Sequence, residues 1–284
     1  MPHSVRRRTA VLRSRYTGES SSAAARGIPR DPHRLGLDEC SPAQRSLRVF
    51  LALGIFNQGL REATPGQWGI SGITSYNIVL SPNFEHLNVI CPTPYNAVRY
   101  LASTRPVHHL PGLRLVEQIG DTYRLCHLPT GATMSVTAQP SCRPDPEDDL
   151  GHGSQRLLRI SDPLVEEELG ALSDVPAASP TAQMLLAGLM VRLCLRDPAG
   201  LWAVGAFTED PLDRAATRPV WSASRRLWGH GTRWELEWTS YPFPEDLVAA
   251  LTDPVAGIRE ARSSKVRQGW DVALGDSLLA LRPR

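Results

Sequence analysis

The apolar residues of this chain recur with two different spacings, and each spacing predicts a different kind of element. Residues 41–59 begin with serine and proline, a pair that favours the N-cap and first turn of a helix. Within them Leu47, Leu51 and Ile55 fall on one helical face. Residues 179–200 begin with the same pair and are apolar nearly all round, which predicts a buried helix.

A β-rich stretch follows each of these predicted helices. Apolar and polar residues alternate in residues 232–238, with Trp234, Leu236 and Trp238 on one face and charged residues on the other. Short apolar runs bounded by turn residues predict further strands at 73–80, 86–91, 201–207 and about 219–226.

The order of predicted elements is the same in the two parts of the chain. A proline begins a second helix at Pro94 and again at Pro244, and each part closes with a hairpin on glycine, at Gly131 and at Gly275. Both parts therefore read α-β-β-α-β-β, which predicts an α+β fold with mainly antiparallel sheets and a tandem duplication of one unit. The alternative is that any α+β protein yields such a match once its elements are chosen to fit.

Charge marks off two further segments. Residues 1–40, here called the leader, hold eight arginines against four acids, so we expect a flexible basic segment with a short helix at most. Residues 141–178, here called the acidic connector, hold nine acids against three arginines and several prolines. A first α+β unit is expected at 41–140 and a second at 179–284, with a short helix near 163–172 in the connector.

The composition is that of a folded globular protein. Of 284 residues, 42% are apolar and 21% are charged, which excludes wholesale disorder. The formal charge of +2 excludes a histone-like, strongly basic binder and leaves room for local patches. Lys265 is the one lysine among 31 basic residues, so 31 − 1 = 30 are arginines. That ratio is typical of a G+C-rich, actinobacterial gene.

The cysteines and the apolar runs favour a cytoplasmic location. The five cysteines are odd in number and form no Cys-x-x-Cys pair, a pattern more typical of a reduced cytosol than of a disulfide framework. The arginine-rich start lacks the apolar stretch of a secretory signal. No run of about 18 apolar residues predicts a membrane span, so no membrane association is expected.

The motifs of common nucleotide- and metal-dependent enzymes are missing from the sequence. It contains no P-loop motif G-x-x-x-x-G-K-[ST], no G-x-G-x-x-G fingerprint after a strand, and no H-E-x-x-H. A nucleophile elbow G-x-S-x-G is missing as well. We therefore expect no cofactor.

One loose group of cysteines and histidines offers candidate chemistry. Cys91, His108, His109, Cys126 and His127 lie on or beside predicted strands, and thiolate with imidazole can bind zinc or form a nucleophile and its base. Neighbouring strand residues point to opposite faces, so adjacent members cannot share one ion. We expect no metal site here, and Cys91 or Cys126 with His109 or His127 is the alternative catalytic site between the two halves.

The leader provides the main candidates for nucleic-acid binding. Arg6, Arg7, Arg8, Arg13 and Arg15 could each neutralise a phosphate and so give a salt-dependent affinity. The alternative is a solvated basic tail with no ligand.

A second group of arginines lies among tryptophans in residues 221–238. Arg225 and Arg226 are interleaved with aromatic rings, a combination that suits single-stranded nucleic acid because bases stack and phosphates pair with guanidinium. A sheet core with charged edges has the same composition, and the alternation favours a core position for Trp234 and Trp238.

Three short stretches resemble known proteins. The entry TGES before an alanine-rich segment resembles the start of the second helix of ribbon-helix-helix repressors, over about twelve residues. RYTGE, SPAQ and SYNIV are similar to stretches of uncharacterised hypothetical proteins of Streptomyces-type, actinobacterial bacteria. Residues 238–253 resemble the strand-turn-helix end of a Streptomyces domain family of unknown function. These resemblances imply an actinobacterial source and no particular activity.

The leading hypothesis from the sequence is a non-enzymatic regulatory or accessory protein that acts on nucleic acid. It would bind DNA through the leader, take part in transcription regulation, and come from a plasmid or another accessory element. One alternative is a hydrolase or transferase with the Cys/His site. Another is a protein-interaction module whose acidic connector binds a basic partner.

Overall fold

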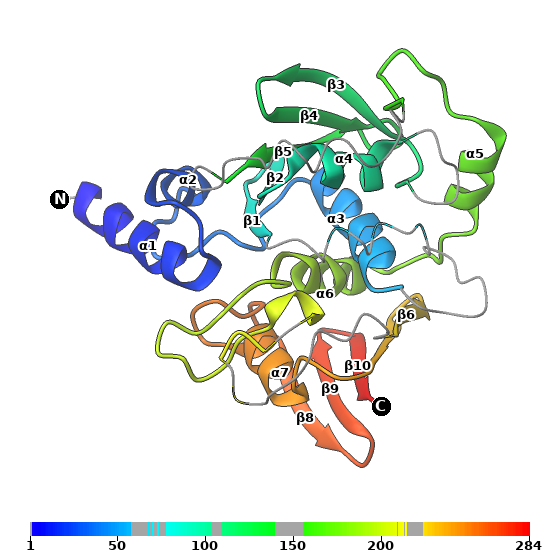
Figure 1. Ribbon diagram of the computed structural model, residues 1–284. Coiled ribbons are helices and arrows are strands. Elements are labelled where there is room, and N and C mark those ends of the chain that lie inside the picture. Colours follow the sequence, from blue (N-terminus) through cyan, green and yellow to red (C-terminus); the bar gives the residue numbers. More distant parts are fainter. Residues whose placement is uncertain are drawn as a thin grey trace.

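Two five-stranded sheets form the framework of the protein, with helices between them and at one side (Figure 1). The computed structural model describes residues 2–57, 68, 70, 73, 78–103, 109–139, 156–208, 210–212, 214 and 224–284. Helices α3 and α6 lie between the two sheets, α4 packs on the first sheet and α7 on the second. Among the described residues no helix is long and apolar enough to cross a bilayer.

The first unit is a mixed sheet with two helices. Its strands lie in the order β1-β2-β5-β4-β3, with β2 parallel to β5 and the other neighbours antiparallel. In chain order the elements are α3 (Pro42–Ile55), β1 (Val79–Pro82), β2 (His86–Cys91), α4 (Pro94–Ala102), β3 (Leu113–Ile119), β4 (Thr122–His127) and β5 (Ala132–Ala138).

The second unit repeats that arrangement. Its strands lie in the order β6-β7-β10-β9-β8, with β7 parallel to β10 and the other neighbours antiparallel. In chain order the elements are α6 (Pro180–Val191), the 3-10 turn η3 (Gly205–Phe207), β6 (Arg225–His230), β7 (Arg233–Trp238), α7 (Pro244–Thr252), β8 (Arg262–Val266), β9 (Gly269–Leu274) and β10 (Ser277–Pro283).

The predicted α+β fold with mainly antiparallel strands is confirmed, and each unit contains one strand that was not predicted. The described elements of each unit read α-β-β-α-β-β-β, and β3 and β8 are the added strands. The side chains of β8 are nearly all exposed, so its sequence shows no alternation of apolar and polar residues that would predict a strand. It is a strand because it pairs with β9. The two units share one order of elements, which agrees with a tandem duplication. The duplication itself is a statement about ancestry and stays a prediction.

One predicted strand is wrong, and two others lie partly outside the described residues. Residues 201–207 contain η3 and an isolated bridge at Ala203, because Ala206 and Phe207 adopt positive φ angles of 53° and 64° that a strand does not allow. Of the predicted strand 73–80, residues 74–77 lie outside the described ranges, and β1 begins at Val79. Of the predicted strand at about 219–226, residues 219–223 lie outside them as well, and β6 begins at Arg225.

The predicted starts of the two central helices are confirmed. The Ser41 hydroxyl accepts a hydrogen bond from the Gln44 N–H at 3.3 Å, and the Ser179 hydroxyl accepts one from the Ala182 N–H at 3.1 Å. Pro42 and Pro180 each follow as the first helical residue. Helices α3 and α6 pack together, and a single hydrophobic cluster runs through both units.

The leader is folded onto both units, so the expectation of a short helix at most is wrong. It contains α1 (Pro2–Thr17) and α2 (Ser21–Gly27), which pack side by side. Arg13 on α1 donates to the carbonyl of Pro82 in the first unit at 2.6 Å. The Arg196 N–H of the second unit donates to the carbonyl of Tyr16 at 3.1 Å, and the Tyr16 ring lies 6.2 Å from the Trp202 ring. Polar contacts between residues far apart in the chain produce no periodic pattern of apolar residues, so the sequence pattern could not predict this packing.

The acidic connector contains the predicted short helix, α5 (Glu166–Ser173). Residues 141–155 of the connector lie outside the described ranges. Glu168 on α5 is 2% exposed, so this part of the connector is not merely a solvated acidic surface.

Candidate nucleic-acid interface

The arginines of α1 lie on two different faces of the helix. With 3.6 residues per turn, residues seven positions apart lie almost above one another. Arg6 and Arg13 therefore share one face, which is turned towards α2 and the loop after it. Arg8 and Arg15 share another face with Arg7 beside them, and all three side chains are exposed. The helix thus divides the predicted set into two groups with different surroundings.

Arg13 is fully buried and uses all five of its N–H donors. Its Nε and Nη2 each donate to a carboxylate oxygen of Glu19 at 2.7 Å. Nη1 donates to the carbonyls of Gly27 at 2.6 Å and Leu35 at 2.8 Å, and Nη2 also donates to the carbonyl of Pro82 at 2.6 Å. A guanidinium has five donors, so none remains for a phosphate. Arg13 is therefore a structural anchor, and its assignment as a phosphate contact is corrected.

Arg6 is held by the backbone at the end of α2. Its Nη2 donates to the carbonyls of Ala25 at 3.2 Å and Ile28 at 3.1 Å, and its Nη1 donates to that of Pro29 at 3.5 Å. The side chain remains exposed. Arg6 is therefore fixed in position while still accessible from solvent.

Arg7, Arg8 and Arg15 carry exposed charge that no carboxylate of the described residues pairs with, and we call them the α1 arginine face. Residues 2–30 hold seven arginines and a single acid. That acid is Glu19, and Arg13 already binds it. The positive charge of this end of the molecule is therefore not neutralised locally.

A hollow of about 680 Å³ opens beside Arg6, between the end of α2 and the turn after β1. Phe84 stands at this hollow with 57% of its surface exposed. Guanidinium groups next to an exposed ring suit a nucleotide, because phosphate pairs with the charge and a base stacks on the ring. Other side chains that line the hollow are those of Arg26, Arg30, Asp31 and Glu39.

The second predicted arginine group, on β6, is separate from the α1 arginine face. Arg225 is 2% exposed, donates from Nη1 to the carbonyl of Ala206 at 3.2 Å, and lies 5.9 Å from the centre of the Phe207 ring. Burial lowers the pKa of Arg225 to about 10. Because the side chain is buried, its assignment to a phosphate surface is corrected. Arg226 is half-buried and lies 4.3 Å from the centre of the Trp228 ring. Figure 1 shows β6 on the opposite side of the molecule from α1.

The tryptophans of β7 belong to the core, as their alternation predicts. Trp234 and Trp238 are 3% and 1% exposed. Their indole N–H groups donate to the carbonyls of Gly231 at 3.2 Å and Pro242 at 2.9 Å. Neither ring is therefore available for base stacking, and Trp221 lies outside the described residues.

The two cysteines of the alternative catalytic site lie far apart. Cys91 is level with Ala138 of β5, whereas Cys126 is level with Thr133 of the same strand. Five residues of β5 separate these levels, or about 16 Å at ~3.3 Å per residue, and the odd number puts the cysteines on opposite faces of the sheet. Burial raises the pKa of Cys91 to about 12 and also raises that of Cys126, so neither thiol is an activated nucleophile.

The two histidines of that site make structural hydrogen bonds. His127 is fully buried, with Nε2 at 3.0 Å from the Pro111 carbonyl and Nδ1 at 2.9 Å from the Thr130 hydroxyl. A carbonyl can only accept, so Nε2 carries the proton and Nδ1 accepts from Thr130. Burial lowers the pKa of His127 to about 4. The Nε2 of His109 lies 3.0 Å from a carboxylate oxygen of Glu168, so its partner is an acid and not a thiol.

Glu168 joins the acidic connector to the first unit. Its two oxygens accept from Arg114 at 2.8 and 2.6 Å, and the backbone N–H groups of Gly112 and Val165 donate to it at 2.8 and 3.2 Å. Burial alone raises the pKa of Glu168, but the hydrogen bonds from Arg114, His109 and the two N–H groups outweigh burial and hold it well below its usual range. This cluster is an ion-pair anchor without a nucleophile.

The Cys/His residues thus form no common site in the part of the chain that the structure describes. No group of three or more histidine, cysteine, aspartate or glutamate side chains there is placed to hold a metal ion. His108 lies outside the described residues.

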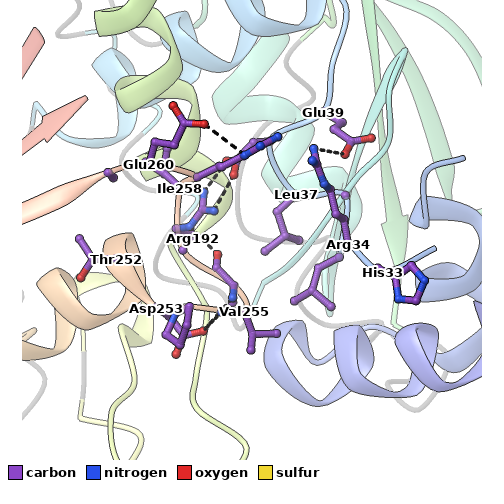
Figure 2. Close-up of a pocket in the computed structure, with 18 residues that line it drawn as sticks. His33, Arg34, Leu37, Glu39, Arg192, Thr252, Asp253, Val255, Ile258 and Glu260 are labelled. Carbon is purple, nitrogen blue, oxygen red and sulfur yellow. Dashed lines mark hydrogen bonds and ion pairs between the residues drawn. The ribbon is translucent and has the colours of Figure 1, made fainter. Parts of the chain in front are cut away.

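A second hollow, of about 450 Å³, lies between the loop before α3 and the loop after α7 (Figure 2). Figure 2 shows basic and acidic side chains facing one another across it, and burial raises the pKa of Glu39 in its wall. Charges balance here, unlike at α1, so this hollow does not favour a polyanion. The pairs are Arg34 with Glu39 at 3.8 Å, Arg192 with Asp38 at 2.6 Å and Arg259 with Glu260 at 3.3 Å.

Comparison with known proteins finds no matching family model, no matching curated protein and no matching solved structure.

Proposed function

We propose that this chain is a non-enzymatic protein that binds nucleic acid, with DNA as the expected ligand, through the α1 arginine face. The observation that supports this most directly is the exposed charge of Arg7, Arg8 and Arg15, which has no carboxylate partner among the described residues. Phosphate contacts made by arginine supply most of the affinity in non-specific nucleic-acid binding. A regulatory or accessory role in the cytoplasm is part of the proposal.

The docking of α1 strengthens this proposal. Arg13 and Tyr16 fix the helix to both units, so the three exposed arginines project from a rigid support. A preorganised surface loses less conformational freedom on binding than a flexible tail does. The folded leader therefore supports phosphate binding better than the flexible leader expected from the sequence.

The hollow beside Arg6 extends the proposed surface. Arg26 and Arg30 add two exposed guanidinium groups, and Phe84 adds an exposed ring. A strand that crosses α1 can place one nucleotide at this hollow, where stacking adds about 1–3 kcal/mol per base.

Two observations support the non-enzymatic and cytoplasmic parts of the proposal. The Cys/His candidates are held apart on opposite sheet faces or in structural hydrogen bonds. Cys40, Cys91, Cys126 and Cys194 are all free thiols, which suits a reducing compartment.

The test is the affinity of the full chain for fluorescently labelled single- and double-stranded DNA, measured by anisotropy. We compare the wild type with an α1 variant, Arg7→Gln, Arg8→Gln and Arg15→Gln. The matched control changes Arg233, Arg262 and Arg267 to Gln, three exposed arginines of the second unit. Each triple variant moves the formal charge from +2 to 2 − 3 = −1.

The α1 variant is expected to bind about 100-fold more weakly at ~0.1 M salt, because three phosphate contacts are lost. The control variant is expected to keep nearly the affinity of the wild type. Equal losses in the two variants would show a general effect of net charge, and no binding by the wild type would end the proposal. Deletion of residues 1–40 is not a clean test, because it removes Tyr16, Leu35 and Leu37 from the core.

A further inference from the structure

Three buried arginines of the described residues are each matched to one carboxylate. Arg13, Arg114 and Arg192 each bind both oxygens of one acid, which are those of Glu19, Glu168 and Asp38. Their remaining donors go largely to backbone carbonyls. Such pairing offsets the large free-energy cost of taking a guanidinium out of water.

Arg48 on α3 is buried without such a match. It is 0% exposed, and no carboxylate of the described residues forms an ion pair with it. Nη1 donates to the Leu37 carbonyl at 3.0 Å and Nη2 to the Asn83 carbonyl at 2.9 Å, while Nε has no partner. Two of five donors are thus used, against five of five for Arg13. Burial lowers the pKa of Arg48, as expected for a charge without a direct counter-ion.

A small cavity of about 40 Å³ lies at Arg48, where the two units meet. Arg45, one turn before Arg48 on α3, lines it from the first unit, and Arg259 lines it from the loop after α7. Ile258 and the apolar side of α6 close the remaining wall. A water molecule needs roughly 10–15 Å³ by this kind of measure, so the cavity has room for about three waters or one small ion and none for a nucleoside.

The charge around this cavity is positive. Asp38 also lines it, and each of its oxygens accepts a hydrogen bond from Arg192, at 2.6 and 2.8 Å. Arg259 contacts Glu260 at 3.3 Å in an exposed pair, which is a weak interaction. Arg45 has no ion-pair partner among the described residues, so neither Arg45 nor Arg48 forms an ion pair with a carboxylate there.

We propose that this cavity binds a small inorganic oxyanion of the phosphate or sulfate class. The anion accepts from the Arg48 guanidinium, which has donors left without a partner, and from Arg45 and Arg259 at the rim. Because α3 and the loop after α7 both supply ligands, the bound anion bridges the two units and stabilises their packing. The site is separate from the α1 arginine face and does not depend on the proposed nucleic-acid binding.

The test is isothermal titration calorimetry of the full chain with sodium phosphate and, separately, sodium sulfate, with ionic strength held constant by sodium chloride. One saturable site per chain is expected, together with a rise in melting temperature that saturates over the same range. Arg45→Gln and Arg259→Gln are each expected to weaken binding about tenfold, which is typical of one charge-assisted hydrogen bond. The matched control is Arg262→Gln, an exposed arginine on β8 away from the cavity, and it is expected to leave the affinity unchanged.

Further variants separate the cavity from other sources of anion binding. Arg48→Met keeps the apolar stem and is expected to abolish binding; if that protein does not fold, the two rim variants still decide the matter. The α1 variant described above is expected to bind phosphate as the wild type does. Loss of phosphate binding in that variant, unchanged affinity in both rim variants, or a melting temperature that rises without saturation would overturn the proposed site, the last because such salts stabilise proteins in general.

Discussion

The environment of each guanidinium decides what an arginine does in this protein. Arg13 is buried with Glu19 and all donors used, whereas Arg15, two positions later, is exposed. Helical spacing alone could have separated Arg6 and Arg13 from Arg8 and Arg15. It could not show which face is buried, because the partners of Arg13 come from residues up to 69 positions away. That long-range information is absent from local sequence patterns.

Replacement of Arg13 by Met is expected to lower the free energy of unfolding by about 3–5 kcal/mol, because it leaves the Glu19 carboxylate buried without its partner. Urea unfolding followed by tryptophan fluorescence measures the change. The control Arg15→Met, on the exposed face, is expected to stay within about 0.5 kcal/mol of the wild type. Similar effects of the two substitutions would contradict the assignment of Arg13 as an anchor.

His127 is expected to make the fold sensitive to mild acid. Its pKa is about 4 in the folded protein and roughly 6.5 when unfolded, so the unfolded chain takes up a proton first as the pH falls. The stability that the neutral form contributes is present above pH ~6.5, declines below it, and is fully lost by about pH 4. At pH ~5 the loss is about 2 kcal/mol.

The measurement is urea unfolding at pH 7 and pH 5 for the wild type and for His127→Gln, which can still donate to the Pro111 carbonyl. The variant is expected to lose about 2 kcal/mol less than the wild type between the two pH values. Burial also lowers the pKa of His86, which acts in the same direction and equally in both proteins. An identical loss in the two proteins would rule out His127 as the cause.

The helices of this protein were predictable from the sequence where their signals are local. The serine caps and prolines of α3 and α6, and the short helix α5, follow from a few neighbouring residues. The strand β8 was not predictable, because its exposed residues show no alternation and its partner β9 defines it. Helix α1 escaped prediction for a related reason, since its stability comes from contacts with both units.

Replacing each of two helical glycines by alanine is expected to change the stability of the protein in opposite directions. A Cβ on Gly188 of α6 would lie 2.5 Å from Cδ1 and 2.8 Å from Cγ1 of the buried Ile258, so Gly188→Ala is expected to destabilise the protein by about 1–3 kcal/mol. A Cβ on Gly170 of α5 meets nothing within 4 Å. Gly170→Ala is therefore expected to stabilise it by about 0.4–1 kcal/mol. Melting temperatures of the two variants test this, and equal shifts would contradict the close contact at α6.

At the scale of the whole molecule, the leader and both units form one continuous structure. The hydrophobic cluster that contains Tyr16, Leu47 and Leu185 spans all three parts. The two units share a strand order that the sequence pattern only partly revealed, because β3 and β8 were missed. The positive end of the molecule could be predicted from the arginine count of residues 2–30, whereas its division into anchors and exposed charges could not.

The salt dependence of DNA binding shows most directly whether the α1 arginine face binds phosphate or whether only the net charge of the protein matters. The logarithm of the binding constant for duplex DNA falls with the logarithm of salt concentration by about 0.9 per neutralised phosphate. Between roughly 50 and 200 mM salt, we expect the α1 variant to show a slope shallower than the wild type by about 2.7, for three lost contacts, and the Arg233, Arg262 and Arg267 control to keep the wild-type slope. Equal slopes for the wild type and the α1 variant would contradict nucleic-acid binding by Arg7, Arg8 and Arg15.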